Sequence, residues 1–168
     1  MPTLYLITGP WGAGKTSAAL PLARLLPECV VFDWDAIIPG ISEAAGKDVR
    51  TDPTSWKGLR VTWVAVIGAV LAGGRSVVLF GPATPEDFED SLNGVPVRCA
   101  YLECPPAVLE QRLQARGESA ADISDELAYA VELRNSSHTP IPTEGLTPLE
   151  VAQEIAQWIR SVGLRLVS

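Results

Sequence analysis

The sequence predicts an α/β fold built on a parallel sheet, and two observations carry this prediction. Short apolar runs alternate with longer stretches of helical spacing along the chain, as they do in α/β proteins. The first apolar run leads through a glycine-rich segment directly into a helical stretch. Strands that are joined through helices pair in parallel, because the helix returns the chain to the same end of the sheet.

The first half of the chain is expected to contain two strands and two helices. Leu4–Thr8 is a short apolar run that ends at a glycine, which is typical of a buried strand. A helix from Gly14 or Lys15 to about Leu26 follows, and Pro21 is expected to kink it. Val30–Phe32 is the second strand. Ser55–Ala72 is apolar on nearly every face, so we expect a long helix that the rest of the protein largely covers.

The alternation continues in the second half. Ser76–Phe80 and Val97–Leu102 are apolar and fit two further strands. A helix over Pro106–Arg116 has proline in its first turn, where helices accept it. After the small polar segment Gly117–Asp122, Ser124 is expected to cap a helix that ends near Asn135.

The end of the chain is expected to return to the sheet and then form a last helix. His138–Leu146 is predicted as a loop with room for a short strand. Thr147 and Glu150 match a capping box, with Pro148 at the first helical position. Because no linker-like segment interrupts residues 1–168, we expect a single domain.

Composition limits the classes of function. A net charge of −7 and a pI near 4.7 argue against general nucleic-acid binding, because phosphates require a basic face. Cys29, Cys99 and Cys104 form no CxxC pair, which favours reduced thiols in or beside strands over disulfides or metal ligands. The apolar run Val61–Ala72 is too short to span a bilayer, and no signal-type segment begins the chain. We therefore expect a cytoplasmic protein without membrane contacts, and the sequence indicates no oligomeric state.

The strongest motif is Gly9–Thr16, GPWGAGKT, which matches G-x-x-x-x-G-K-[ST] between a predicted strand and a predicted helix. The glycines let backbone N–H groups turn inward around a phosphate, and the helix N-terminus adds partial positive charge. Lys15 would bridge the β- and γ-phosphates, and the Thr16 hydroxyl would bind Mg²⁺. The expected nucleotide is ATP, with GTP as the alternative. The residues expected to bind it are Gly9, Trp11, Gly12, Ala13, Gly14, Lys15, Thr16 and Ser17.

Together with the chain length and the early phosphate loop, Asp33-Trp34-Asp35 and the pair Arg112/Arg116 resemble the small-molecule kinase group of P-loop proteins. That group includes shikimate kinase, gluconate kinase, the nucleoside monophosphate kinases and chloramphenicol phosphotransferase. The resemblance implies the P-loop NTPase fold, with a five-stranded parallel sheet flanked by helices. It also implies an acceptor-binding region over about residues 36–72 and a mobile helical lid over about 112–127. The implied activity is transfer of the γ-phosphoryl group of ATP to a hydroxyl of an antibiotic, a sugar acid or a metabolite.

Asp33 and Asp35 follow the second strand, at the edge where open α/β sheets bind ligands. Because they are two residues apart, both carboxylates would point the same way on an extended chain. By resemblance, Asp33 would hold Mg²⁺ directly or through water, and Asp35 would accept the proton of the acceptor hydroxyl. A solvated acidic turn or a helix N-cap is the structural alternative.

Arg112 and Arg116 are candidates for the lid. They are four residues apart and share a predicted helix face, so both can address one anion. A guanidinium that closes over the β,γ-bridge would neutralise charge that develops as the γ-phosphoryl group leaves. A surface pair is the alternative, and Arg134 is a further candidate for the lid.

Arg60 is the single charged residue between Gly58 and Gly74. An isolated buried cation needs a carboxylate, such as Asp33, Asp35 or Glu103, or a substrate anion. Both explanations stay open. If Arg50, Lys57 and Arg60 line a closed pocket that faces Asp35, an acceptor kinase follows. The candidate acceptor-binding residues are Trp34, Asp35, Arg50, Arg60, Gly81 and Arg134.

Two departures from common P-loop patterns affect the expected function. No acidic residue follows Ser76–Phe80, so the usual Walker B carboxylate is missing and a metal would depend on Thr16 and Asp33. Gly81–Thr84 stands where this group often has a substrate-binding turn, but the shikimate pattern of glycines and arginines is absent. The alternative functions are a nucleotide or polynucleotide 5′-kinase and a regulatory ATPase that transfers nothing.

Overall fold

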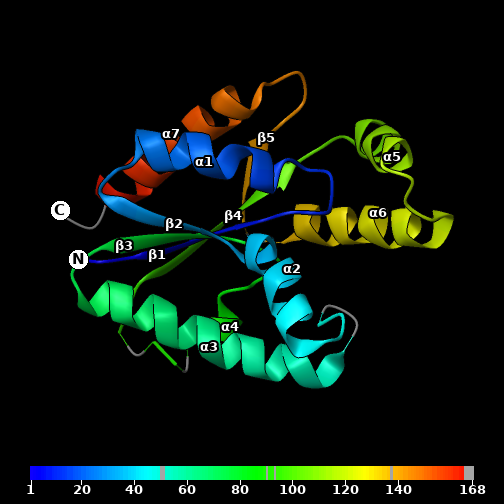
Figure 1. Cartoon of the computed structure of the whole chain (residues 1–168). Helices are drawn as coiled ribbons and strands as arrows, with labels where there is room; N and C mark the ends of the chain where they lie inside the picture. The colour runs from blue at the N-terminus through cyan, green and yellow to red at the C-terminus, as the bar shows by residue number, and fades with distance from the viewer. Residues whose placement is uncertain (50–51, 90, 93, 137, 165–168) are drawn as a thin grey trace.

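The computed structural model describes residues 1–49, 52–89, 91–92, 94–136 and 138–164, which form one sheet with helices on both faces (Figure 1). The strands are β1 (Leu4–Thr8), β2 (Cys29–Asp33), β3 (Ser76–Phe80), β4 (Val97–Glu103) and β5 (Thr139–Pro142). The helices are α1 (Lys15–Leu25), α2 (Trp34–Ala45), α3 (Pro53–Ala72), α4 (Glu86–Glu89), α5 (Pro106–Ala115), α6 (Ala120–Asn135) and α7 (Pro148–Leu164).

The five strands lie in the order β2-β3-β1-β4-β5, and every neighbouring pair is parallel. The predicted five-stranded parallel sheet is therefore confirmed. β1 is central, with Leu4 in register with Val77 on one side and Val97 on the other. The strands that neighbour β1 belong to different halves of the chain, so the segment after β1 begins at the point where open α/β sheets bind ligands.

Two apolar cores lie on opposite faces of the sheet, because side chains alternate along β1. Tyr5 and Ile7 face the layer of α1 and α7, where Tyr5 meets Trp158 edge-to-face with ring centroids 5.8 Å apart. Leu4 and Leu6 face the layer of α2, α3 and α4. β1 is thus held rigidly from both sides, which gives the following loop a fixed starting point.

The hairpin of α5 and α6 extends from the end of the sheet, away from the two main layers (Figure 1). Its own small core joins Leu109 and Leu113 of α5 to Ile123 and Ala130 of α6. This hairpin is the segment that the sequence predicts as a lid.

The caps of the last two long helices were predicted with different success. The side chain of Ser119, not Ser124, caps α6 by accepting the N–H of Asp122 at 3.2 Å, so the predicted cap at Ser124 is wrong. Alanines after Ser119 favour helix over the polar loop that we expected. The capping box of α7 is confirmed, because Glu150 accepts the Thr147 N–H at 2.7 Å and donates its own N–H to the Thr147 hydroxyl at 3.3 Å.

The expectation that α3 is largely covered is correct for one face only. Leu59, Trp63 and Ile67 are buried, whereas Val61 and Val66 are exposed. The reason is that α3 lies in an outer layer, with the sheet on one side only (Figure 1). No helix in the described parts of the chain is both long enough and apolar enough to cross a membrane. The three cysteines are free thiols in β2 and in or just after β4, as predicted.

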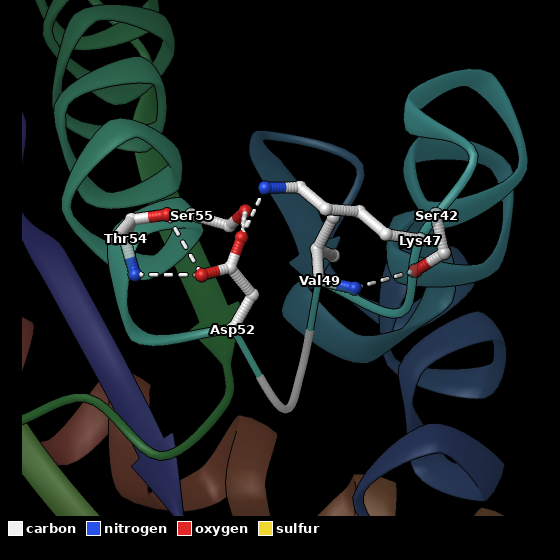
Figure 2. A network of polar contacts seen from close by, with 6 residues as sticks. All are labelled: Ser42, Lys47, Val49, Asp52, Thr54 and Ser55. Atoms are coloured by element: carbon white, nitrogen blue, oxygen red, sulfur yellow. Dashed lines mark hydrogen bonds and ion pairs between the residues drawn. The ribbon is translucent and has the colours of Figure 1, made fainter.

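A network of polar contacts joins the residues just after α2 to the start of α3 (Figure 2). Asp52 caps α3 by accepting the N–H of Thr54 at 3.0 Å, and its other carboxylate oxygen pairs with Lys47. The amide of Val49 donates to the Ser42 hydroxyl at 3.2 Å, which ties the turn back to α2. The network therefore sets the relative placement of the two helices in the predicted acceptor-binding region.

Candidate active site

The glycine-rich loop after β1 curls tightly before α1. Gly9, Gly12 and Gly14 have φ angles of 154°, 78° and 105°, which residues with side chains rarely adopt. A Cβ on Gly12 would lie 3.4 Å from two leucine side chains of α5. The motif thus places glycine where the backbone requires it, and the loop rests directly on the α5–α6 hairpin.

Lys15, the first residue of α1, is folded back into this loop and is only 7% exposed. Its Nζ donates to the carbonyl oxygens of Gly9 at 2.6 Å and Pro10 at 3.1 Å. The ammonium group therefore lies inside the curl of the backbone, where it can reach a bound phosphate by a change of rotamer.

Several charged groups act on this ammonium. Burial lowers the pKa of Lys15, and the carboxylates of Asp35, Glu126 and Asp33 oppose that shift, with Asp35 the strongest of the three. The positive charge of Arg116 acts in the same direction as burial. The loop thus has acidic groups from α2, α6 and β2 around one buried cation.

Asp33 and Asp35 sit on different elements. Asp33 ends β2 and caps α2, since its Oδ1 accepts the N–H of Asp35 at 3.0 Å. The expectation of an extended chain at this point is wrong, because α2 begins at Trp34 without an intervening loop. The N-cap alternative is correct for Asp33, but capping uses only one of its two oxygens.

The second carboxylate oxygen of Asp33, Oδ2, is buried and has no hydrogen-bond partner among the described residues. A buried unpaired carboxylate oxygen is costly unless a cation or water satisfies it. Mg²⁺ in phosphotransfer sites binds one or two protein oxygens and otherwise waters and substrate phosphates. Asp33 and the exposed Thr16, at the start of α1, fit such an ion. Within the described residues, no group of three or more His, Cys, Asp or Glu side chains could hold a metal.

Trp34 packs in the core and its burial contradicts the expected contact with a substrate. It is 4% exposed and stacks on Trp63, with ring centroids 5.5 Å apart and an interplanar angle of 24°. Gly81 lies against it, because a Cβ on Gly81 would come within 2.8 Å of the Trp34 Cβ. Gly81 therefore allows the close approach of β3 and α2 that places the two aspartates.

The predicted pair of lid arginines separates into two different environments. Nη1 of Arg112, on α5, donates to the Gly12 carbonyl at 3.1 Å and lies 3.7 Å from the Cys104 sulfur. Arg116 is the C-cap residue of α5 and is exposed. Arg112 thus holds the phosphate loop itself, whereas Arg116 is the member of the pair that solvent or a ligand can reach.

Two other predicted cations are paired with carboxylates. The Arg60 side chain is 56% exposed and pairs with Asp87 at 2.9 Å. The expectation of a buried cation paired with Asp33, Asp35 or Glu103 is wrong, because this side of α3 faces solvent and α4. Arg134 pairs with Glu103 at 3.1 Å. Arg50 lies outside the described residues.

Two contacts from α6 to the loop region were not predicted. Glu126 Oε2 accepts the N–H of Trp11 at 2.7 Å, and the hydroxyl oxygens of Tyr129 and Thr8 are 2.8 Å apart. Glu126 and Tyr129 share one face of α6, because residues three apart are neighbours on a helix. No local pattern marks these two residues, which contact positions more than a hundred residues earlier. The Trp11 indole itself is 45% exposed.

A hollow of about 340 Å³ lies elsewhere, near the N-terminus and the end of α3. Among the described residues, its lining includes Met1, Leu71 and Leu92 and contains no charged side chain. A phosphate-binding site needs N–H donors and cations, and at the glycine-rich loop Lys15 provides a cation.

The strand order, the curled loop and the buried lysine together define a P-loop protein of the small-molecule kinase type. The chain belongs to the AAA domain family, whose model matches residues 4–140.

Solved structures with this fold include two metabolic kinases and an antibiotic-resistance protein. The tunicamycin resistance protein of Deinococcus radiodurans has a TM-score of 0.67 at 20% identity, covering 95% of this chain and 96% of that one. Shikimate kinase from Acinetobacter baumannii, in complex with shikimate, has a TM-score of 0.64 at 21% identity, covering 96% and 94%. A gluconokinase from Sinorhizobium meliloti 1021 has a TM-score of 0.59 at 19% identity, covering 98% and 97%. At these identities the likeness is one of fold.

A curated relative, a nucleotide-binding protein of Moorella thermoacetica, is 27% identical over 175 residues. The match covers 99% of this chain and 55% of the relative, so the chain spans about half the length of that protein.

Proposed function

We propose that the protein is an ATP-dependent phosphotransferase that moves the γ-phosphoryl group to a hydroxyl of a small molecule. One observation carries the proposal: the phosphate loop folds the buried Lys15 ammonium onto its own carbonyls, at the same edge of the sheet where β2 ends at Asp33 and α2 begins with Asp35 in its first turn. Phosphoryl transfer to an alcohol requires a cation that binds the transferred phosphate and a carboxylate that accepts the hydroxyl proton.

In this proposal the phosphates of ATP bind the loop amides and the N-terminus of α1, and Lys15 exchanges its two carbonyl partners for the β- and γ-phosphates. The acceptor oxygen forms a bond to the γ-phosphorus while the bond to the β,γ-bridging oxygen breaks, which leaves ADP. The acceptor proton passes to the Asp35 carboxylate. Arg116, exposed at the end of α5, neutralises charge on the departing oxygen.

Asp33 and Thr16 would hold Mg²⁺, which supplies positive charge to the β- and γ-phosphates when bound. The N-cap contact orients Asp33, because its Oδ1 is held by the Asp35 amide while Oδ2 remains for the ion. The same contact ties the Asp35 backbone to the Asp33 carboxylate.

The acceptor would bind over α2 and α3, within about residues 36–72. Hydroxylated antibiotics and sugar acids are the first classes to test, because proteins of this fold include a tunicamycin resistance protein and a gluconokinase. A 5′-kinase of nucleotides or polynucleotides and a non-transferring regulatory ATPase are the other candidates. No contact in the described residues favours either one. We expect the protein to act in the cytoplasm, where ATP and reduced thiols occur together.

A screen of ATP consumption tests the proposal. Purified protein would be incubated with Mg·ATP or Mg·GTP and a panel of hydroxylated antibiotics, sugars, sugar acids and nucleotides, with ADP formation and product mass as readouts. We expect ADP formation that depends on one acceptor class and a product heavier by one phosphoryl group. Nucleotide hydrolysis without any phosphorylated product would instead support the regulatory ATPase.

A further inference from the structure

The α5–α6 hairpin holds the phosphate loop at two successive residues. From α6, Glu126 accepts the N–H of Trp11 at 2.7 Å, and from α5, Arg112 donates to the carbonyl of Gly12 at 3.1 Å. Both bonds involve an ionised side chain and a backbone group, a class stronger than neutral hydrogen bonds. Tyr129 adds a third contact, to Thr8 at the end of β1.

The Glu126 bond holds one peptide unit of the loop. The Trp11 N–H belongs to the Pro10–Trp11 peptide plane, and the carbonyl of the same plane accepts from Lys15 Nζ at 3.1 Å and from the Ala13 N–H at 3.2 Å. Because a peptide unit is planar, contacts on its N–H and on its carbonyl together fix its orientation. The Pro10–Trp11 peptide therefore links Glu126 of α6 to the lysine of the phosphate loop.

Glu126 is half-buried at this position, and both its burial and the charges around it affect its carboxylate. Burial raises the pKa of Glu126, with Asp125 and Asp122 of α6 acting in the same direction, while the Trp11 amide and Lys15 oppose the shift. A carboxylate in such a place has a cost in desolvation that its hydrogen bond must offset. The contact with the loop is therefore the feature that distinguishes Glu126 from the other acidic residues of α6.

We propose that Glu126 is a positioning residue for the nucleotide: it holds the Trp11 amide and so fixes the Pro10–Trp11 peptide, whose carbonyl holds Lys15 and the Ala13 amide, in the phosphate loop. The inference rests on the proposed function, since it concerns the same loop. Glu126 touches neither substrate nor reacting atoms, and it acts through the backbone that binds the phosphates.

Three variants test this role: Glu126→Ala, Glu126→Gln and, as a matched control, Glu132→Ala, which removes an exposed carboxylate from the same helix. Calorimetry with Mg·ATP, steady-state turnover and amide exchange at Trp11 are the readouts. Glu126→Ala is expected to weaken Mg·ATP binding about tenfold, the effect of one hydrogen bond to a charged group. KM for ATP is expected to rise with kcat nearly unchanged, and the Trp11 amide to exchange faster.

Glu126→Gln is expected to restore most of the affinity, because its amide oxygen accepts the same N–H, and Glu132→Ala is expected to match wild type. Unchanged binding in Glu126→Ala overturns the proposal, as does tighter binding, which would mean that the carboxylate competes with phosphate. If Glu126→Ala does not fold, a rapidly exchanging Trp11 amide in wild type overturns it. If wild-type protein binds ATP but phosphorylates no acceptor, that result counts against the proposed function alone. ATP binding and exchange of the Trp11 amide still decide the role of Glu126.

Discussion

Gly81, just after β3, lies directly against Trp34, the first residue of α2, so that a Cβ on Gly81 would approach the Trp34 Cβ to 2.8 Å. Trp34 stands between Asp33 and Asp35, and its ring stacks on Trp63 of α3. The contact therefore controls where both carboxylates of the candidate site lie, although neither Gly81 nor Trp34 has chemistry of its own.

Replacing Gly81 tests this control. Gly81→Ala must displace Trp34 or the end of β3, which is expected to cost about 1–3 kcal/mol in the free energy of unfolding, measured by urea denaturation. Turnover is expected to fall further than stability alone explains, because Asp35 moves with Trp34. Gly58→Ala on α3 is the control, since a Cβ there meets nothing within 4 Å and alanine favours helix. Equal stability and activity in the two variants would contradict the positioning role of Gly81.

Lys15 and Asp35 are expected to fail in different ways when replaced. Lys15→Ala should abolish ATP turnover, because the β- and γ-phosphates lose their cation. Asp35→Asn should lower the transfer rate by about 10²–10⁴, the usual range for general base catalysis, while leaving ATP binding nearly intact. Calorimetry and turnover on the same preparations separate these effects. If both variants lost ATP binding equally, Asp35 would have no role as the base.

The unpartnered oxygen of Asp33 predicts a specific dependence on magnesium. Asp33→Asn keeps an acceptor for the Asp35 amide but presents a neutral group to the ion, so the concentration of Mg²⁺ for half-maximal turnover should rise. Titration of Mg²⁺ at saturating ATP measures this change. An unaltered Mg²⁺ requirement in the variant would remove Asp33 from the metal site. Chelation of Mg²⁺ should stop transfer in wild type.

The turn between α2 and α3 is expected to lose stability in acid. A hydrogen bond from Lys47, with others from Thr54 and Ser55, holds the pKa of Asp52 well below its usual range. The folded state favours the ionised form of Asp52. Its contribution to the free energy of unfolding is therefore present above the unfolded pKa of about 4, and it is lost as the pH falls toward the lower pKa of the folded state. Asp52→Asn should therefore unfold more easily than wild type at pH 7, and the difference should shrink by pH 3.

Urea denaturation at both pH values provides the measurement for the Asp52 variant. Glu154→Gln, which alters an exposed carboxylate on α7, is the control and should show no such pH-dependent difference. If the difference in free energy of unfolding between wild type and Asp52→Asn were the same at pH 7 and pH 3, the role given to the ionised cap would be contradicted.

The parts of the site that the sequence predicts are those set by local chemistry. The motif around Lys15 is local, because everything that determines how the loop curls lies within eight residues: the glycines, the lysine and the start of the helix. The strands were predicted for a related reason, because short continuous apolar runs that are bounded by turn residues are typical of buried strands. The capping box at Thr147 is also complete within four residues.

The parts that the sequence does not predict depend on contacts between distant segments. Trp34 was assigned to a ligand because it adjoins the aspartates, but Trp63 on α3 buries it. Arg60 was expected to be buried because its neighbours are apolar, yet the helix turns it outward to Asp87. Glu126 carries no motif at all, and only the docking of α6 on the loop gives it a role. In each case tertiary packing outweighs the local pattern.

The most direct test of the account is a calorimetric titration of wild-type protein and Lys15→Ala with Mg·ATP. The account predicts saturable binding at one site in wild type and its loss in the variant, because the buried ammonium and the curled loop form the phosphate site together. No binding to wild type, or equal affinity in both proteins, would contradict it.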